Sequence, residues 1–360
     1  MRGHHALNAT AWTAGQVERI TAAPLPAPPP ITALDAAPVI PGLFLWDLWP
    51  VQHRDGRVAV VAGAELWLAL SAPATPDPVK RHDRARIRLL VHDGAGWSDL
   101  GDALPDGLSP GSREWSGSAI LDGNRLTLFF TAAGRRGEAG ISYEQRLFAV
   151  TARLDDGHRL SDWSVPVEAV RSDGIVYHPA QQDDGVVGTI KAFRDPAYFR
   201  DPADGAEYLL FTGSLAASPS AFNGAIGLAQ RVGGAWTLLP PLLHADTVNN
   251  ELERPHVVVH KGHYYLFWST QASVFAPGIT APTGLYGMVA ERLLGPYVPL
   301  NGSGLVLANP AAAPSQSYSW LVLADLRVAS FIDLLDDGAF GGVPGPMRHL
   351  VLDGATTQLL

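Results

Sequence analysis

Glycine-containing turns between short apolar runs constrain the fold of this chain more than any other feature. Asp55-Gly56, Asp122-Gly123-Asn124, Asp156-Gly157 and Lys261-Gly262 each separate two such runs. Pairs of this kind favour tight β-hairpins because their residues accept the positive φ angles that those turns need. Helical periodicity is weak and confined to Ala14–Ala22. The sequence therefore predicts an all-β protein.

The apolar runs predict strands of ordinary length at roughly even spacing. They are Arg57–Leu70, Ile87–His92, Ser118–Leu121, Arg125–Thr131, Leu147–Leu154, Val186–Phe193, Glu207–Thr212, Ala225–Val232, His256–His260, His263–Ser269 and Leu285–Ala290, with three more near Leu305, Trp320 and Val328. About 15 to 20 strands can form a sandwich, barrel or propeller, and four-stranded propeller blades close the sheet edges most economically. No repeat of fixed period is visible, so the residues alone do not set the number of blades.

The 360 residues are interpreted as one folded unit preceded by an arm. A hydrophobic fraction of 47% is enough for a large core and excludes a disordered chain. Residues 22–30 contain five prolines, which favour an extended segment over a helix. We expect residues 1–38 to form a proline-rich N-terminal arm that packs on the core, and residues 39–360 to form a single domain.

Composition excludes several classes of function. A net charge of -9, with no basic cluster beyond one short run between Lys80 and Arg88, argues against a nucleic-acid partner. No cysteine is present, so disulfides, a thiolate nucleophile and cysteine-ligated zinc are excluded. We find no phosphate-binding glycine loop, dinucleotide fingerprint or calcium loop, and expect no cofactor and no metal. There is no run long enough for a membrane span and no signal-peptide pattern, so the chain is expected to be cytoplasmic or exported by a signal-independent route.

The first candidate site is the segment Trp46-Asp47-Leu48-Trp49-Pro50, in which one carboxylate lies between two tryptophans. The flat face of an aromatic ring suits the apolar face of a sugar ring, so Asp47 is a candidate for chemistry on a sugar. The alternative is an apolar turn in which Asp47 only caps a backbone group.

The second candidate site is Phe193-Arg194-Asp195-Pro196. The proline that follows Asp195 favours extended geometry, which would place this carboxylate at a strand end facing a channel. The alternative is a surface turn closed by an Arg194–Asp195 ion pair.

The third candidate site is the segment from Asn249 to His256. In an extended strand Glu251 and Glu253 point to the same face, with Leu252 and Arg254 opposite. Two like charges on one face raise the pKa of one carboxyl group, which keeps it a proton donor near neutral pH. The alternative is a solvated strand edge in which Arg254 neutralises a glutamate.

The segment Glu114-Trp115-Ser116-Gly117 combines an acid, an aromatic ring and a hydroxyl group. Trp115 as a core residue and Ser116 as a turn residue are the alternative. No Gly-x-Ser-x-Gly motif is present, so the chemistry of a serine hydrolase is not supported. The histidines lack a zinc-binding spacing and are interpreted as structural or surface residues.

Taken together, these segments resemble the levansucrase family, glycoside hydrolase family 68, in the form typical of its Gram-negative members. The matching motifs are Trp46-Asp47 with Trp49-Pro50, Glu114-Trp115-Ser116-Gly117, Phe193-Arg194-Asp195-Pro196, Glu251-x-Glu253-Arg254-Pro255-His256 and Gln316-x-Tyr318-Ser319. Asn301–Leu307 with Asn309-Pro310, and Ser330–Asp333, also look like later segments of that family. The resemblance runs from about Trp12 to near the C-terminus. Five separate motifs in the family's order and rough spacing are a specific signal.

The resemblance implies a five-bladed β-propeller with a central active-site pocket, in which residues 39–360 are the catalytic domain. It implies a retaining enzyme that cleaves sucrose through a covalent fructosyl-enzyme and passes the fructosyl unit to water or to a sugar acceptor. By family motif Asp47 is the nucleophile, Asp195 stabilises the transition state and Glu253 is the general acid and base. Substrate-binding roles are implied for Trp46, Trp115, Ser116, Arg194, Glu251 and Tyr318.

One position departs from the family pattern. After the strand His263–Thr270, polymer-forming members typically carry a basic residue, whereas this chain has Gln271. An amide can bind a sugar hydroxyl but supplies no positive charge, so hydrolysis or short products are expected over a long polymer. The partners expected are sucrose and sugar acceptors, with no nucleic acid or membrane, for a monomer or weak homo-oligomer. The alternatives are a non-catalytic carbohydrate-binding propeller and a related propeller hydrolase that acts on another furanoside.

Overall fold

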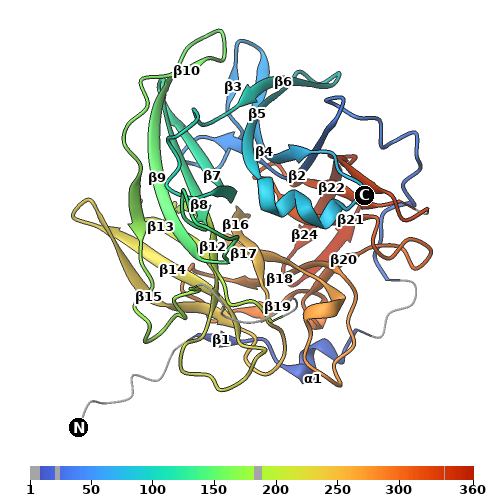
Figure 1. Ribbon diagram of the computed structural model, residues 1–360. Coiled ribbons are helices and arrows are strands. Elements are labelled where there is room, and N and C mark those ends of the chain that lie inside the picture. Colours follow the sequence, from blue (N-terminus) through green and yellow to red (C-terminus); the bar gives the residue numbers. More distant parts are fainter. Residues whose placement is uncertain (1–8, 21–24, 182–188, 336) are drawn as a thin grey trace.

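A computed structural model describes residues 9–20, 25–181, 189–335 and 337–360. Its strands form five antiparallel blades around a central axis (Figure 1). Blade 1 contains β2 (Leu43–Gln52), β3 (Val60–Val61), β4 (Ala64–Pro73), β5 (Arg86–His92) and β6 (Trp97–Asp102). Blade 2 contains β7 (Arg113–Asp122), β8 (Arg125–Ala133), β9 (Gln145–Leu154), β10 (Leu160–Ser161) and β11 (Val167–Val170). Parallel pairing of β2 with β7 joins these two blades into one sheet.

The other three blades are separate sheets. Blade 3 contains β12 (Phe193–Arg200), β13 (Glu207–Ser214), β14 (Gly224–Val232) and β15 (Ala235–His244), with β1 (Thr10–Ala11) added in parallel to β15. Blade 4 contains β16 (Glu253–His260), β17 (His263–Thr270), β18 (Gly284–Ala290), β19 (Val298–Pro299) and β20 (Leu305–Ala308). Blade 5 contains β21 (Ser317–Val322), β22 (Arg327–Leu334), β23 (Phe340–Pro344), β24 (Arg348–Asp353) and β25 (Thr356–Leu359).

The first strands of the blades line the channel. Each of β2, β7, β12, β16 and β21 contacts the next, and β21 contacts β2, so the ring closes. Within the described residues, helical structure is limited to α1 (Ala14–Val17) and the 3-10 turns η1 (Pro78–Arg84), η2 (Ala272–Val274) and η3 (Leu300–Gly302). No helix in the described part of the chain is long and apolar enough to cross a membrane. The all-β, five-bladed prediction is confirmed.

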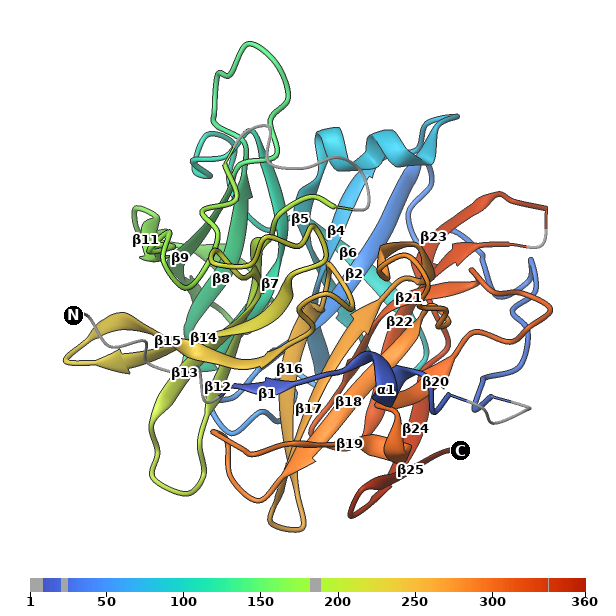
Figure 2. The ribbon, with the colours of Figure 1, turned by 90° about the horizontal axis from the view of Figure 1, so that it is seen from below.

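Aromatic packing ties the N-terminal segment to the blades. Trp12 is fully buried; its indole contacts the rings of Trp268 and Tyr286 at centroid distances of 5.2 and 5.1 Å. Its Nε1 donates a hydrogen bond of 2.9 Å to the carbonyl oxygen of Ser303. Figure 2 shows β1 and α1 beside blades 3 and 4. Trp12 belongs, with Trp268 and Tyr286, to the buried hydrophobic cluster between these blades.

Three sequence predictions of local structure were wrong. The run Arg57–Leu70 is not one strand, because Ala62 and Gly63 take positive φ angles of 48° and 87° and form a hairpin between β3 and β4. The helix at Ala14 ends at Val17 rather than near Ala22, which lies outside the described residues. The strand expected at Val186–Phe193 falls partly outside the described residues and begins only at Phe193.

A bulge interrupts each of the five inner strands. The pairing with the second strand shifts between Trp46 and Trp49, between Trp115 and Gly117, between Arg194 and Ala197, between Glu253 and His256, and between Tyr318 and Leu321. A bulge inserts an unpaired residue and re-aims its side chain. The motifs around Asp47, Ser116, Asp195, Glu253 and Tyr318 therefore lie at the same structural feature, each in its own blade.

Candidate active site

The bulges put equivalent residues of four blades into left-handed backbone. Asp47, Asp195, Arg254 and Ser319 have φ angles of 50°, 59°, 50° and 59°. Aspartate tolerates this conformation better than most residues. The extended geometry expected for Asp195 before Pro196 was wrong, because the register shift of β12 dictates its backbone. Side chains at these positions point around the channel instead of alternating across a sheet.

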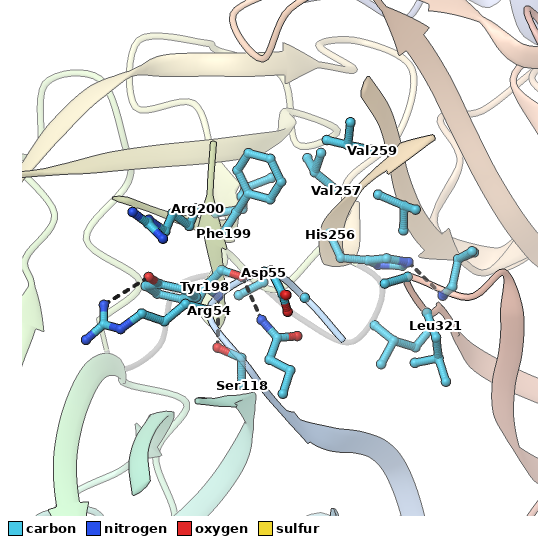
Figure 3. Close-up of a pocket in the computed structure, with 18 of the residues that line it drawn as sticks. Arg54, Asp55, Ser118, Tyr198, Phe199, Arg200, His256, Val257, Val259 and Leu321 are labelled. Atoms are coloured by element: carbon cyan, nitrogen blue, oxygen red, sulfur yellow. Dashed lines mark hydrogen bonds between the residues drawn. The ribbon is translucent and has the colours of Figure 1, made fainter. Parts of the chain in front are cut away.

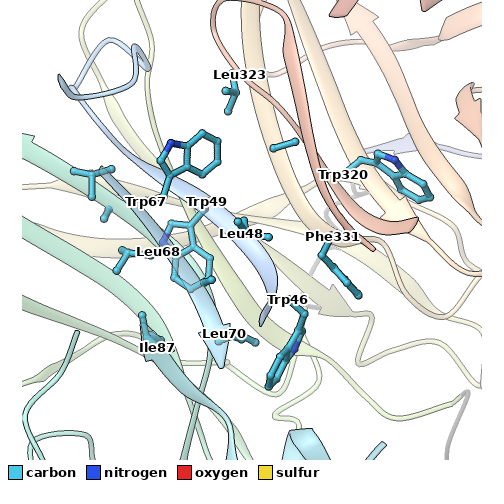
Figure 4. Close-up of a cluster of buried hydrophobic side chains, with 14 of the residues drawn as sticks. Trp46, Leu48, Trp49, Trp67, Leu68, Leu70, Ile87, Trp320, Leu323 and Phe331 are labelled. Carbon is cyan, nitrogen blue, oxygen red and sulfur yellow. The ribbon is translucent and has the colours of Figure 1, made fainter. Parts of the chain in front are cut away.

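Asp47 is held by the neighbouring blade. Its Oδ2 accepts a hydrogen bond of 2.7 Å from Ser116 Oγ, which lies at the bulge of β7. Trp46 and Trp49 on either side are 1% and 2% exposed and belong to the buried cluster of Figure 4. The packing of these two tryptophans in the core therefore holds in place the strand that carries Asp47.

Asp195 lies deeper and is 7% exposed. Its Oδ2 accepts a hydrogen bond of 2.9 Å from Thr212 Oγ1, and its backbone N–H donates one of 2.9 Å to Thr131 Oγ1. Burial raises the pKa of this carboxyl to about 6; the Arg194 guanidinium opposes the shift, while the charges of Glu253 and Asp47 add to it. The Arg194–Asp195 ion pair is present, with 3.6 Å between Arg194 Nε and Asp195 Oδ2, but both side chains are buried, so it does not close a surface turn.

Glu253 binds two partners that the sequence placed near it. Its Oε1 accepts a hydrogen bond of 2.7 Å from Arg194 Nη2, and its Oε2 accepts one from the Tyr318 hydroxyl. Burial, followed by the charge of Glu253, raises the pKa of Tyr318, so the phenol remains a proton donor. Tyr318 thus lies next to Glu253, as the resemblance implied.

Glu251 approaches the same guanidinium, with 3.4 Å between its Oε2 and Arg194 Nη2. The two glutamates therefore project together as predicted, although β16 begins only at Glu253. Burial raises the pKa of Glu251 to about 7; Arg194 opposes this shift and Glu253 adds to it. Two carboxylates thus share one buried cation.

Arg254 has a structural role that the sequence did not indicate. Its Nη2 donates a hydrogen bond of 2.6 Å to the carbonyl oxygen of Leu48, and its Nη1 donates one of 3.1 Å to that of Ser319. It therefore ties blade 4 to blades 1 and 5 and neutralises neither glutamate. Its neighbour His256 accepts a hydrogen bond from Val322 N–H, consistent with the structural role expected for the histidines.

Three indole N–H groups in the bulge motifs have no protein partner. Nε1 of Trp46, Trp49 and Trp115 are buried and have no hydrogen-bond partner among the described residues. A buried N–H group without a partner costs free energy, and a sugar hydroxyl would satisfy it. Gln271 is connected to Glu251 only through its neighbours in the chain. It follows Thr270, whose hydroxyl accepts a hydrogen bond from Asn249, and the side chain of Asn249 accepts one from the backbone N–H of Glu251.

A cavity of about 610 Å³ occupies the part of the channel beyond the bulges (Figure 3). It is lined by the second halves of the inner strands and the turns that follow them, and Asp195 and Arg254 lie at its inner end. Its polar side chains are already hydrogen bonded to other groups of the protein. Arg54 donates to Tyr198 and Glu207, and both ring nitrogens of His256 bind the backbone. Asp47 and Glu253 lie outside its lining.

The fold and site define a five-bladed β-propeller with three carboxyl groups gathered at the bulges of its inner strands. The family model described as levansucrase/invertase, glycoside hydrolase family 68, matches residues 1–223 and 218–343. The chain belongs to this family, as the sequence motifs indicated.

Individual relatives agree with this assignment. A levansucrase of Pseudomonas savastanoi pv. glycinea is 33% identical over 90% of this chain and 84% of its own length. A levansucrase of Zymomonas mobilis is 33% identical over 86% of this chain and 81% of its own. The structure of an inulosucrase from Halalkalicoccus jeotgali bound to kestose has a TM-score of 0.89 and 38% identity, covering 98% of this chain and 95% of that one. A levansucrase from Gluconacetobacter diazotrophicus shares the fold, with a TM-score of 0.86 and 24% identity, over 98% and 90% of the two chains.

Proposed function

We propose that this protein is a retaining fructosyltransferase or β-fructofuranosidase that cleaves sucrose. The observation that carries the proposal is the arrangement of three carboxyl groups around one guanidinium. Arg194 contacts Glu253, Glu251 and Asp195, while Asp47 is held separately by Ser116. One carboxylate is thereby kept apart for attack, and another is provided with neighbours that allow it to carry a proton.

In the first step Asp47 attacks the anomeric carbon of the fructosyl unit. Its Oδ2 accepts the Ser116 hydrogen bond, which leaves Oδ1 to form the new C–O bond. The bond between the anomeric carbon and the glycosidic oxygen breaks, and its electron pair remains on that oxygen. Glu253 transfers its proton to the oxygen, and glucose leaves. Asp195 accepts hydrogen bonds from fructosyl hydroxyls as positive charge develops on the ring.

In the second step Glu253, now a carboxylate, takes a proton from the acceptor. The acceptor oxygen, from water or from a sugar hydroxyl, attacks the anomeric carbon and displaces Asp47 as a free carboxylate. Tyr318 and Arg194 remain hydrogen bonded to the two oxygens of Glu253, so they keep its orientation fixed through both proton transfers. Two inversions at the anomeric carbon retain its configuration.

The identity of the acceptor sets the product. The side chain of Gln271 makes no capping hydrogen bond at the start of η2 and is partly exposed. It can bind an acceptor hydroxyl but carries no charge to anchor a growing chain. Release of fructose and transfer to short oligosaccharides are therefore favoured over polymer. We propose that a monomer or weak homo-oligomer is sufficient, because all the groups named above come from one chain.

Incubation with concentrated sucrose tests the activity. Free glucose should appear in the wild type, because every turnover releases it. Equal glucose and fructose would identify water as the acceptor, whereas an excess of glucose would identify transfer. The variants Asp47→Asn and Glu253→Gln should each lose roughly a thousandfold or more in rate, since each lacks a group that forms or breaks a bond.

Glu291→Gln, an exposed surface carboxylate, is the matched control and should retain full rate. Release of neither sugar by a folded wild type would overturn the proposal and favour the non-catalytic carbohydrate-binding propeller. Wild-type rates in Asp47→Asn would retain a sucrose activity but reject this mechanism.

A further inference from the structure

The 3-10 turn η1 brings a cation into contact with the nucleophile's neighbour. The Arg81 guanidinium carbon lies 5.5 Å from the ring centroid of Trp46 and 4.2 Å from that of Phe340. These distances are typical of cation–π contacts. His82 on the same turn approaches the Trp46 ring edge-on at 5.7 Å. The ring of Trp46, the residue before Asp47, is thus contacted by two residues of η1, which is not a strand of its sheet.

Arg81 has few partners of its own. Its Nη1 donates a hydrogen bond of 2.8 Å to the carbonyl oxygen of Pro78, within the same turn. Its Nε is buried and has no hydrogen-bond partner among the described residues. The acidic groups that interact with its charge are Asp333 and Asp47, and neither lies within ion-pair distance. An arginine packed between two rings without a carboxylate partner is costly for stability alone, which points to a role at the site.

The charged and titratable groups that face Asp47 come from four elements. They are Arg81 and His82 of η1, Asp195 of β12, Tyr318 of β21 and Asp333 of β22. Burial, followed by Arg81, lowers the pKa of His82 to about 3, so this histidine is neutral in the working range. Burial raises the pKa of Asp333 to about 6, which leaves it largely uncharged in moderately acidic solution. Arg81 is therefore the permanent positive charge in this group.

We propose that Arg81 is a positioning residue for the nucleophile: its guanidinium packs against the ring of Trp46 and thereby fixes the strand position from which Asp47 acts. This inference rests on the proposed function, in which Asp47 attacks. The planar guanidinium fills the space between the rings of Trp46 and Phe340, a contact that a lysine side chain reproduces only in part.

The separate values of kcat and KM for glucose release from sucrose test the proposal. In Arg81→Met kcat should fall roughly tenfold while KM changes little, because the carboxylate is still present but no longer held in the attacking position. In Arg81→Lys the cation remains but the planar stacking is lost, so kcat should fall several-fold, less than in Arg81→Met. Arg84→Met, an exposed arginine of the same turn, should leave both values unchanged.

The outcomes separate this inference from the proposed function. No glucose release by the wild type would mean that the proposed function itself fails. An active wild type with an unchanged kcat in both Arg81 variants would overturn the role of Arg81 alone. If Arg81→Met fails to fold, Arg81→Lys decides: an unchanged kcat in this folded variant would contradict the positioning role.

Discussion

At the scale of single residues, each carboxyl group is distinguished by its immediate contacts. Asp47 accepts a hydrogen bond from Ser116, Asp195 accepts one from Thr212 in a buried position, and Glu253 is hydrogen bonded on both oxygens. The same functional group can therefore serve as nucleophile, stabiliser or acid because its environment differs. The Ser116 contact is the simplest of these to remove.

The change Ser116→Ala should lower kcat for sucrose cleavage by roughly 10- to 100-fold. A hydrogen bond to a charged group contributes about 1.5–3 kcal/mol, and this one orients the attacking carboxylate. Steady-state glucose release measures the effect. Ser98→Ala, an exposed serine of β6, is the control and should change nothing. An unchanged kcat in Ser116→Ala would show that Asp47 is oriented without the hydroxyl group.

At the scale of elements, the bulge is the device that assembles the site. Motif spacing and order singled out Asp47, Asp195 and Glu253, and the structure places all three at bulges, but Thr212, which hydrogen bonds to Asp195, belongs to no motif. The bulges could not be predicted, since a register shift depends on the partner strand. The same limit applies to Arg81, whose turn carries no motif and reaches Trp46 only through the tertiary fold.

From the bulge of blade 4, Arg254 donates hydrogen bonds to carbonyl groups at the bulges of blades 1 and 5. In Arg254→Met, the carbonyl groups of Leu48 and Ser319 lose their donor, and the free energy of unfolding should fall by about 3 kcal/mol. A lower midpoint of urea unfolding would show this loss. In Arg231→Met, which removes a surface pair with Glu207, the loss should be under about 1 kcal/mol. Equal losses in both variants would contradict the bridging role.

At the scale of the whole molecule, the stability of the propeller outweighs the cost of keeping ionisable carboxyl groups buried in it. Glu251 has its pKa raised from 4.5 to about 7, chiefly by burial. Below about pH 4 this group is protonated in both folded and unfolded chains and has no effect on stability. As the pH rises toward 7, the unfolded chain ionises it freely while the folded chain resists, so the folded state is penalised.

The change Glu251→Gln should therefore stabilise the protein at pH 8 and affect it much less at pH 5. The gain at pH 8 should be on the order of 2 kcal/mol, seen as a rise of a few degrees in Tm, while catalysis is impaired. The exposed residue Glu291 is the control, and Glu291→Gln should leave Tm the same at both pH values. A Tm gain that is equal at pH 5 and pH 8 would contradict the assigned charge penalty.

The central claim is that Asp47 displaces glucose and is then displaced by the acceptor, so that the configuration at the fructosyl carbon is retained. The most direct test supplies sucrose together with methanol as acceptor and identifies the methyl fructoside by NMR before it can rearrange. The account predicts methyl β-fructofuranoside, the configuration of the fructosyl unit in sucrose, and its disappearance in Asp47→Asn. Formation of the α anomer would mean a single displacement and would contradict the mechanism.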